Sequence, residues 1–251
     1  MLPLDCFPQN YLSPSPAHGV PGSLFTWDKY SSFVWNASIL LADKIAAKEI
    51  EVEGKRVLEL GAGLGLPGLV AAHVGADLVV LTDYDEPAAL DDTARAVDEA
   101  LPVALQRKVH VVPHTWGPRI DSLLSLAPSY DLVLVAECVW SPSLHASLVD
   151  SLRALLSASP HATVCFSAGF HSGRKHVASF LAAAADAHIV PVNEKDWVEL
   201  SVDGAARAWE WRRVELARAA KVSVALEEED RQEERNRWTL FGTLCLQSES
   251  A

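Results

Sequence analysis

The sequence has few cysteines, and they are widely spaced along the chain. Cys6, Cys138, Cys165 and Cys245 form no C-x-x-C pair, and the histidines show no metal-ligand spacing. We therefore expect reduced thiols, a cytoplasmic protein and no metal site.

Positive charge is also scarce. The 251 residues hold 21 Lys and Arg against 33 Asp and Glu, a net charge of −12. An acidic surface repels nucleic-acid phosphates, so we expect no nucleic-acid partner. It attracts a basic partner protein, although the same acidity also serves solubility.

Long apolar runs are absent. No run approaches the ~20 residues of a membrane span. Met1 to Pro16 hold no basic residue and no long apolar stretch, so we expect neither a membrane protein nor a signal peptide.

The most informative segment reads V-L-E-L-G-A-G-L-G-L-P-G. Its apolar run breaks into glycines at Gly61, Gly63 and Gly65, and the next apolar run ends in Asp83. Strand, glycine turn, helix, strand and acid form one half of a doubly wound nucleotide-binding unit, in which the acid accepts hydrogen bonds from ribose hydroxyls.

A dinucleotide fingerprint is nevertheless incomplete, because G-x-G-x-x-G from Gly61 finds Leu66 where glycine is required. An acid, Glu59, stands two residues before the first glycine instead. E-x-G-x-G resembles motif I of the S-adenosylmethionine-dependent methyltransferases. Their cofactor carries a sulfonium and an amino group rather than a pyrophosphate, so an acid near the turn is tolerable.

Strand and helix patterns alternate along the chain, which predicts a parallel sheet with helices on both faces. The predicted fold class is α/β, a doubly wound, seven-stranded Rossmann-like methyltransferase sheet whose last strand is antiparallel. The predicted strands are 55–60, 78–82, 109–112, 131–136, 162–167, 188–191 and 238–246, and the predicted helices are 33–47, 67–74, 86–100, 144–158 and 173–187.

Residues 1–22 are rich in proline and predict an irregular arm. The remainder, 23–251, is expected to form a single methyltransferase domain. A charge-dense stretch at about 205–236 precedes the last strand and indicates an insertion.

Ligands of a doubly wound sheet lie beyond the carboxyl ends of its strands. The loops after the first four strands are therefore expected to meet around one pocket. Trp116 offers a flat face for adenine, although a loop tryptophan also serves core packing. The candidates in these loops are Glu59, Gly61, Gly63, Asp83, Tyr84, Trp116, Ala136, Glu137 and Trp140.

Further segments carry a closer resemblance. W-N-A, L-E-L-G-A-G-L-G-L-P, T-D-Y-D-E-P, P-H-T-W-G and D-L-V-L-V-A-E-C-V-W together resemble the family-sixteen lysine methyltransferase group over about residues 24–246. L-L-A-D-K-I, T-W-G and R-N-R-W-T are most similar to its fungal nicotinamide N-methyltransferase-like branch, whose members methylate the N-terminus and lysines of elongation factor 1-alpha. The resemblance implies that S-adenosylmethionine is bound by Trp35, Gly61, Ala62, Gly63, Asp83, Trp116 and Ala136.

The segment after the fourth strand departs from the group. Related lysine methyltransferases often show D-x-x-Y there, and this chain has Glu137 and Trp140 in the same spacing. The asparagine–histidine pair that is common in the fungal branch is absent, since Ser141 and Pro142 follow.

Methyl transfer requires alignment and a neutral amine. A lysine amine has an ordinary pKa of about 10.4, and an N-terminal amine one of about 7.7–8.0. We expect Glu137 to orient the amine, although a strand-end acid also serves as scaffold. Trp140, with Trp27 or Phe170, is expected to wall the pocket and to hold the methylated ammonium through cation–π contacts of ~0.5–2 kcal/mol.

The leading hypothesis is a monomeric protein N-methyltransferase that uses S-adenosylmethionine and acts on a basic protein such as elongation factor 1-alpha. A small-molecule, nicotinamide-type N-methyltransferase is the first alternative. The others are a cofactor-binding scaffold without catalysis and a nicotinamide-dependent dehydrogenase, the latter disfavoured by Leu66.

Overall fold

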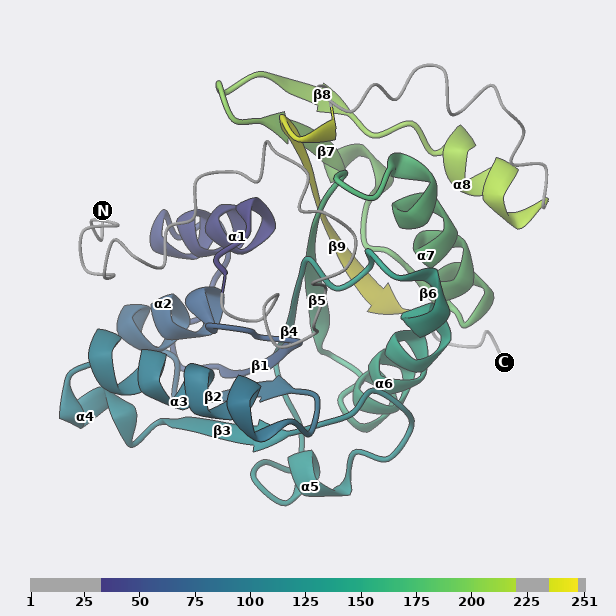
Figure 1. The fold of residues 1–251 in the computed structure, drawn as a ribbon. Helices are drawn as coiled ribbons and strands as arrows, with labels where there is room; N and C mark the ends of the chain where they lie inside the picture. The colour runs from purple at the N-terminus through teal and green to yellow at the C-terminus, as the bar shows by residue number, and fades with distance from the viewer. Residues whose placement is uncertain (1–32, 220–234, 248–251) are drawn as a thin grey trace. The chain divides into compact units, whose positions relative to one another are not determined.

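The computed structural model describes residues 33–219 and 235–247 (Figure 1). These residues belong to two compact units, one ending at Thr115 and the other beginning at Trp116. The expected arm, 1–22, lies outside the described residues, as does part of the charged stretch, 220–234. The single domain over 23–251 stays a prediction.

The first unit contains a parallel sheet with strand order β3-β2-β1. Helix α1 packs against α2, and α3 packs against β2 and β3. The elements are α1 (Asn36–Ala46), β1 (Arg56–Leu60), α2 (Leu66–Val74), β2 (Leu78–Asp83), α3 (Pro87–Ala100), α4 (Val103–Gln106) and β3 (Val109–Pro113).

The sequence explains the boundaries of these elements. β1 and β2 are mostly apolar, and both are buried at nearly every position, as in a parallel sheet that is covered on both faces. Helix α2 has Pro67 in its first turn, where a missing N–H costs nothing. It ends before Gly75, which has a φ of 120° that other residues rarely adopt.

The second unit has strand order β4-β5-β9-β7-β8, with β6 pairing beside β9. β4 and β5 are parallel, whereas β9 runs antiparallel to β5, β6 and β7. The elements are α5 (Asp121–Leu124), β4 (Leu132–Ala136), η4 (Pro142–Leu144), α6 (His145–Ala158), β5 (Thr163–Gly169), α7 (Arg174–Asp186), β6 (Ile189–Pro191), η5 (Glu194–Asp196), β7 (Val198–Ser201), β8 (Ala206–Ala208), α8 (Arg212–Arg218) and β9 (Trp238–Leu246).

The predicted α/β fold class is confirmed. β1 to β6 and β9 fall at the seven predicted strands with small shifts at their ends, and β9 is the antiparallel last strand. The β7–β8 hairpin was not predicted, and it extends the sheet beyond β9.

Packing on β9 holds this hairpin in place. Trp197, which directly precedes β7, is 1% exposed. A Cβ atom added to Gly242 of β9 would lie 2.1 Å from the Trp197 ring, so the indole packs where only glycine leaves room. Trp197 also stacks on Phe166 of β5, with ring centroids 5.7 Å apart.

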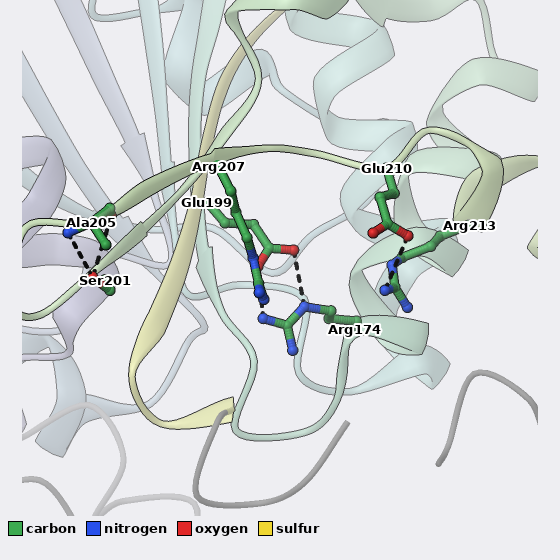
Figure 2. Close-up of polar contacts among 7 residues, drawn as sticks. All are labelled: Arg174, Glu199, Ser201, Ala205, Arg207, Glu210 and Arg213. Carbon is green, nitrogen blue, oxygen red and sulfur yellow. Dashed lines mark hydrogen bonds and ion pairs between the residues drawn. The ribbon is translucent and has the colours of Figure 1, made fainter. Parts of the chain in front are cut away.

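A buried ion cluster links the hairpin to helix α7 (Figure 2). Arg174 donates through Nε and Nη2 to the two carboxylate oxygens of Glu199, at 2.9 and 2.7 Å. Arg207 of β8 donates through Nε to the same carboxylate at 2.8 Å. Because Arg174 and Glu199 are each 3% exposed, neither charge can exchange its partner for water.

Among the described residues, no helix is both long enough and apolar enough to cross a membrane. The same residues hold no group of three or more His, Cys, Asp or Glu side chains arranged to bind a metal ion.

Removing the carboxylate of Glu199 should destabilise the protein strongly, because the buried Arg174 guanidinium would lose the two oxygens that it contacts. We expect Glu199→Ala to lower the free energy of unfolding by about 3–5 kcal/mol. Arg218→Ala breaks an exposed ion pair with Asp186 and should cost less than about 1 kcal/mol. Urea unfolding measures the free energy of unfolding of both variants. An equal loss in the two would contradict the larger role of the buried carboxylate.

Candidate functional site

The glycine turn after β1 has the backbone conformation that its sequence predicts. Gly61, Gly63 and Gly65 have φ angles of 62°, 53° and 70°, a region that residues with a Cβ rarely adopt. The turn is tied to β2, because the N–H of Ala62 donates to the carbonyl of Thr82 at 2.8 Å. Gly65 is buried against the side chain of Leu81. Gly61 and Gly63 are half-buried, and the lack of a side chain at these two positions allows a ligand to approach the backbone closely.

Asp83 ends β2 and holds the same turn. Its Oδ2 accepts from the N–H of Gly63 at 2.8 Å, and its Oδ1 accepts from the N–H of Tyr84 at 2.8 Å. Burial raises the pKa of this carboxyl above its usual value, and the N–H groups of Gly63 and Tyr84 oppose the rise. A carboxylate has about four acceptor positions, so each oxygen retains capacity for one ribose hydroxyl.

Glu59 is buried and contacts the start of helix α2. Glu59 is 1% exposed, and its Oε2 accepts from the N–H of Gly68 at 2.8 Å. Gly68 belongs to the first turn of α2, whose N–H groups have no partner within the helix, and the N-cap residue Gly65 has no side chain to supply one. Glu59 therefore caps α2 from the neighbouring strand, and its contact with a cofactor stays a prediction.

The remaining candidates of the first unit differ in exposure. Ala62 is 7% exposed and Tyr84 is 37% exposed.

Trp35 precedes α1 as its N-cap residue rather than lying within the helix. Its carbonyl accepts from the N–H groups of Ser38 and Ile39 at 3.0 and 3.1 Å. The contacts of Ala62, Tyr84 and Trp35 with a cofactor stay predictions.

In the second unit, Trp116 lies in a loop that is fixed at its next residue. The N–H of Gly117 donates to the Oγ of Ser151 at 2.8 Å, and the same Oγ donates to the carbonyl of Gly117 at 3.0 Å. The indole of Trp116 is half-buried. Stacking on adenine stays a prediction.

The end of β4 places an acid beside β5. Ala136 is the last residue of β4 and pairs with Ser167 of β5. Glu137 follows with a φ of 60°, a conformation that is uncommon without glycine. Its carboxylate accepts from the N–H of Gly169, at 3.2 Å to Oε1 and 3.1 Å to Oε2. The carboxylate is therefore held at the carboxyl ends of two parallel strands.

His171 joins this group, although the sequence analysis did not single it out. Its Nδ1 lies 3.2 Å from Oε1 of Glu137. Burial by itself lowers the pKa of His171, but the hydrogen bond and the charge of Glu137 outweigh that effect and raise the pKa above its usual value. The sequence signal for His171 is its position two residues beyond the end of β5, close to the carboxyl end of a parallel strand, where ligands of this fold bind.

The aromatic wall expected beside Glu137 needs correction. Phe170 is 0% exposed, its ring stacks on Trp209 at 5.9 Å between centroids, and the guanidinium of Arg174 lies 4.1 Å from its centroid. Both neighbours belong to the protein core, so Phe170 does not wall a pocket. Trp27 lies outside the described residues, and Trp140 is half-buried.

Comparisons with known proteins concern the family and the fold. The model of a family described as lysine methyltransferase matches residues 26–184. A protein N-terminal and lysine N-methyltransferase of Schizosaccharomyces pombe is 35% identical over 148 residues, which are 57% of this chain and 56% of that protein. A protein N-lysine methyltransferase of Danio rerio is 39% identical over 127 residues, 51% of this chain and 56% of that protein.

The chain thus spans about half the length of the curated relatives it matches. A solved S-adenosylmethionine-dependent methyltransferase from Geobacter sulfurreducens, in complex with S-adenosyl-L-homocysteine, is similar with a TM-score of 0.50 at 15% identity. The match covers 82% of this chain and 90% of that one, and it supports the Rossmann-like fold.

The capping role of Glu59 predicts a pH dependence of stability. Burial raises the pKa of Glu59 from 4.5 to about 8, the Gly68 N–H opposes the rise and the charge of Asp83 adds to it. Between these two values the folded protein keeps a proton that the unfolded chain has released. The contribution of Glu59 to stability is therefore complete below the lower value and is lost, by up to about 1.4 kcal/mol per pH unit, as the pH rises toward the higher one.

Glu59→Gln tests this, because the amide keeps an acceptor oxygen for Gly68 but does not ionise. We expect the variant to lose less stability than the unchanged protein between about pH 5 and pH 9, measured by urea unfolding at several pH values. Parallel stability curves for the two proteins would contradict the assignment.

Proposed function

The chain belongs to the lysine methyltransferase family, and from that membership we propose that it transfers a methyl group from S-adenosylmethionine to an amine of a protein. The acceptor is a lysine side chain or an N-terminal amine, as in the names of its fungal relatives. The proposal for this chain rests on the cofactor geometry of the first unit and on the anchored carboxylate of the second.

The hydrogen bond between Asp83 and Gly63 is the observation that carries the cofactor proposal. A carboxylate that already accepts N–H groups at both oxygens is fixed in orientation, and it offers two neighbouring acceptors that suit the two hydroxyls of a ribose. The open turn at Gly61 and Gly63 allows the remainder of the nucleoside to approach the backbone. When bound, S-adenosylmethionine supplies a methyl group on a sulfonium.

Glu137 is proposed to orient the acceptor amine. Its carboxylate is fixed by the N–H of Gly169. Because Glu137 is only 9% exposed, a hydrogen bond from an amine to this carboxylate would be largely shielded from water. Such a bond is stronger than one formed in water. Trp140 is proposed to hold the methylated ammonium through a cation–π contact.

A protein substrate is favoured over a small amine by two observations. Relatives from Schizosaccharomyces pombe and Danio rerio are protein methyltransferases, and the net charge of −12 attracts a basic partner. Elongation factor 1-alpha is the substrate that we propose to test first, and the cytoplasm is the compartment in which we propose the reaction.

The first test concerns the cofactor. Asp83→Asn keeps the size of the side chain but removes the charge and one acceptor, so we expect the affinity for S-adenosylmethionine to fall by roughly 10- to 100-fold. Asp85→Asn makes the same chemical change at an exposed position two residues along and should leave the affinity unchanged. Isothermal titration calorimetry with S-adenosylmethionine measures both, and equal affinities in the two variants would contradict the ribose role.

The second test concerns the acceptor. Cytosolic extract and purified elongation factor 1-alpha are each incubated with methyl-labelled S-adenosylmethionine and the protein, its Asp83→Asn variant or its Asp85→Asn variant. We expect label in a protein with the unchanged chain and Asp85→Asn, and a loss of that label with Asp83→Asn. Label confined to small molecules would contradict the protein substrate, and mass spectrometry of a labelled band would distinguish a lysine from the N-terminus.

A further inference from the structure

Three groups meet where the parallel strands β4 and β5 end. Glu137 follows β4, Gly169 is the last residue of β5, and His171 lies two residues later. The Glu137 carboxylate accepts from the N–H of Gly169 through both oxygens and lies 3.2 Å from Nδ1 of His171 through Oε1. The cluster therefore combines an acid, a backbone donor and an imidazole at the edge where ligands of this fold bind.

The backbone around the cluster is adapted to bring these groups together. Glu137 adopts a φ of 60°, which costs energy for a residue with a Cβ and persists where surrounding contacts enforce it. Its N–H donates to the carbonyl of Ser167 at 3.0 Å, which fixes the turn to β5. A Cβ atom at Gly169 would lie 3.0 Å from Oε2, so the approach of the carboxylate leaves little space for any other residue there.

Exposure distinguishes the acid from the imidazole. The Glu137 side chain is 8% exposed and the His171 side chain is 33% exposed, so His171 borders the more accessible side of the pair. An imidazole in this place has two effects on an acidic group. Its Nδ1–H fixes one carboxylate oxygen, and a proton on its second nitrogen adds a positive charge that repels an approaching ammonium.

The surrounding charges define when that proton is present. Glu137 raises the pKa of His171 above its usual value against the opposing effect of burial. On helix α7, His176 interacts with His171 through charge, and its own pKa is lowered, first by burial and then by the charge of Lys175. Whether the imidazole of His171 carries that proton therefore depends on the charge of Glu137 that it faces as well as on the pH.

We propose that His171 is a positioning residue for the acceptor amine, holding the Glu137 carboxylate through Nδ1–H and admitting the amine when the imidazole is neutral. This rests on the proposed methyl transfer, because it assigns the orienting of the amine to Glu137. The imidazole acts through Glu137 and forms no bond to the transferred methyl group.

Two substitutions separate the positioning effect from the effect of charge. Asn places its Nδ2–H₂ at the same distance along the side chain as the Nδ1–H of histidine, but it does not ionise. His171→Asn should therefore keep the rate at high pH and show a smaller decline toward low pH than the unchanged protein, because only the protonation of the acceptor amine then remains. His171→Ala removes the donor and should lower kcat by roughly 10- to 100-fold at every pH, with little change in the affinity for S-adenosylmethionine.

The rate is the initial incorporation of label into the protein band of cytosolic extract, measured across pH 6 to pH 9. His161→Asn, at an exposed position outside the cluster, is the matched control and should follow the unchanged protein. A pH profile of His171→Asn that coincides with the unchanged profile would overturn the proposal, as would full activity of His171→Ala.

A measurement without turnover keeps the proposal testable even if no substrate is labelled. Nuclear magnetic resonance titration of the His171 imidazole should give a lower pKa in Glu137→Gln than in the unchanged protein. An unchanged value would mean that the pair does not interact, and this would overturn the positioning role. Absence of label with the unchanged chain, together with a lowered value, would instead contradict the proposed function and leave the coupled pair established.

Discussion

The hydrogen bond from the Gly63 N–H to the Asp83 carboxylate is the interaction on which the candidate cofactor site depends. It joins the turn after β1 to the end of β2, and it fixes the glycine backbone and the acid with respect to each other. A second bond, from the Gly68 N–H to the Glu59 carboxylate, joins the first turn of α2 to β1. Two acids from adjacent strands thus hold the glycine turn and the start of the helix that follows it, where N-cap Gly65 offers no capping side chain.

A second carboxylate is fixed in the same way in the other unit. Glu137 follows β4 and accepts from the N–H of Gly169 at the end of β5. In both units, a glycine N–H orients an acid at the carboxyl end of a parallel strand, where this fold binds its ligands. The two acids differ in what they offer. Asp83 retains acceptor positions for hydroxyl groups. One oxygen of Glu137 already contacts Nδ1 of His171, and this carboxylate is suited to a cationic or amine partner.

The sequence predicts the strands well because the parallel strands are continuous apolar runs between turn residues. β9 spans the predicted residues Trp238–Leu246. The β7–β8 hairpin was missed because its pattern is interrupted by polar residues, and Glu199 is buried only through its contacts with Arg174 and Arg207. Such long-range ion contacts leave no local periodicity from which a strand could be predicted.

The candidate site was predictable only where its residues form a local sequence pattern. The glycine turn and Asp83 carry a local pattern, and their geometry matches it. Glu59 carries the pattern too, but its carboxylate turns toward Gly68 because α2 lacks a capping side chain. The pairing of His171 with Glu137 depends on a left-handed φ at Glu137, and Phe170 is covered by Trp209. Neither contact is encoded by residue spacing.

A crystal structure of the chain with S-adenosyl-L-homocysteine tests the central claim most directly, since that compound keeps the ribose and adenine of the proposed cofactor. We expect both ribose hydroxyls to donate to the Asp83 carboxylate and the nucleoside to lie against the turn at Gly61 and Gly63. A nucleoside bound elsewhere, or a ribose without contact to Asp83, would contradict the proposed cofactor site.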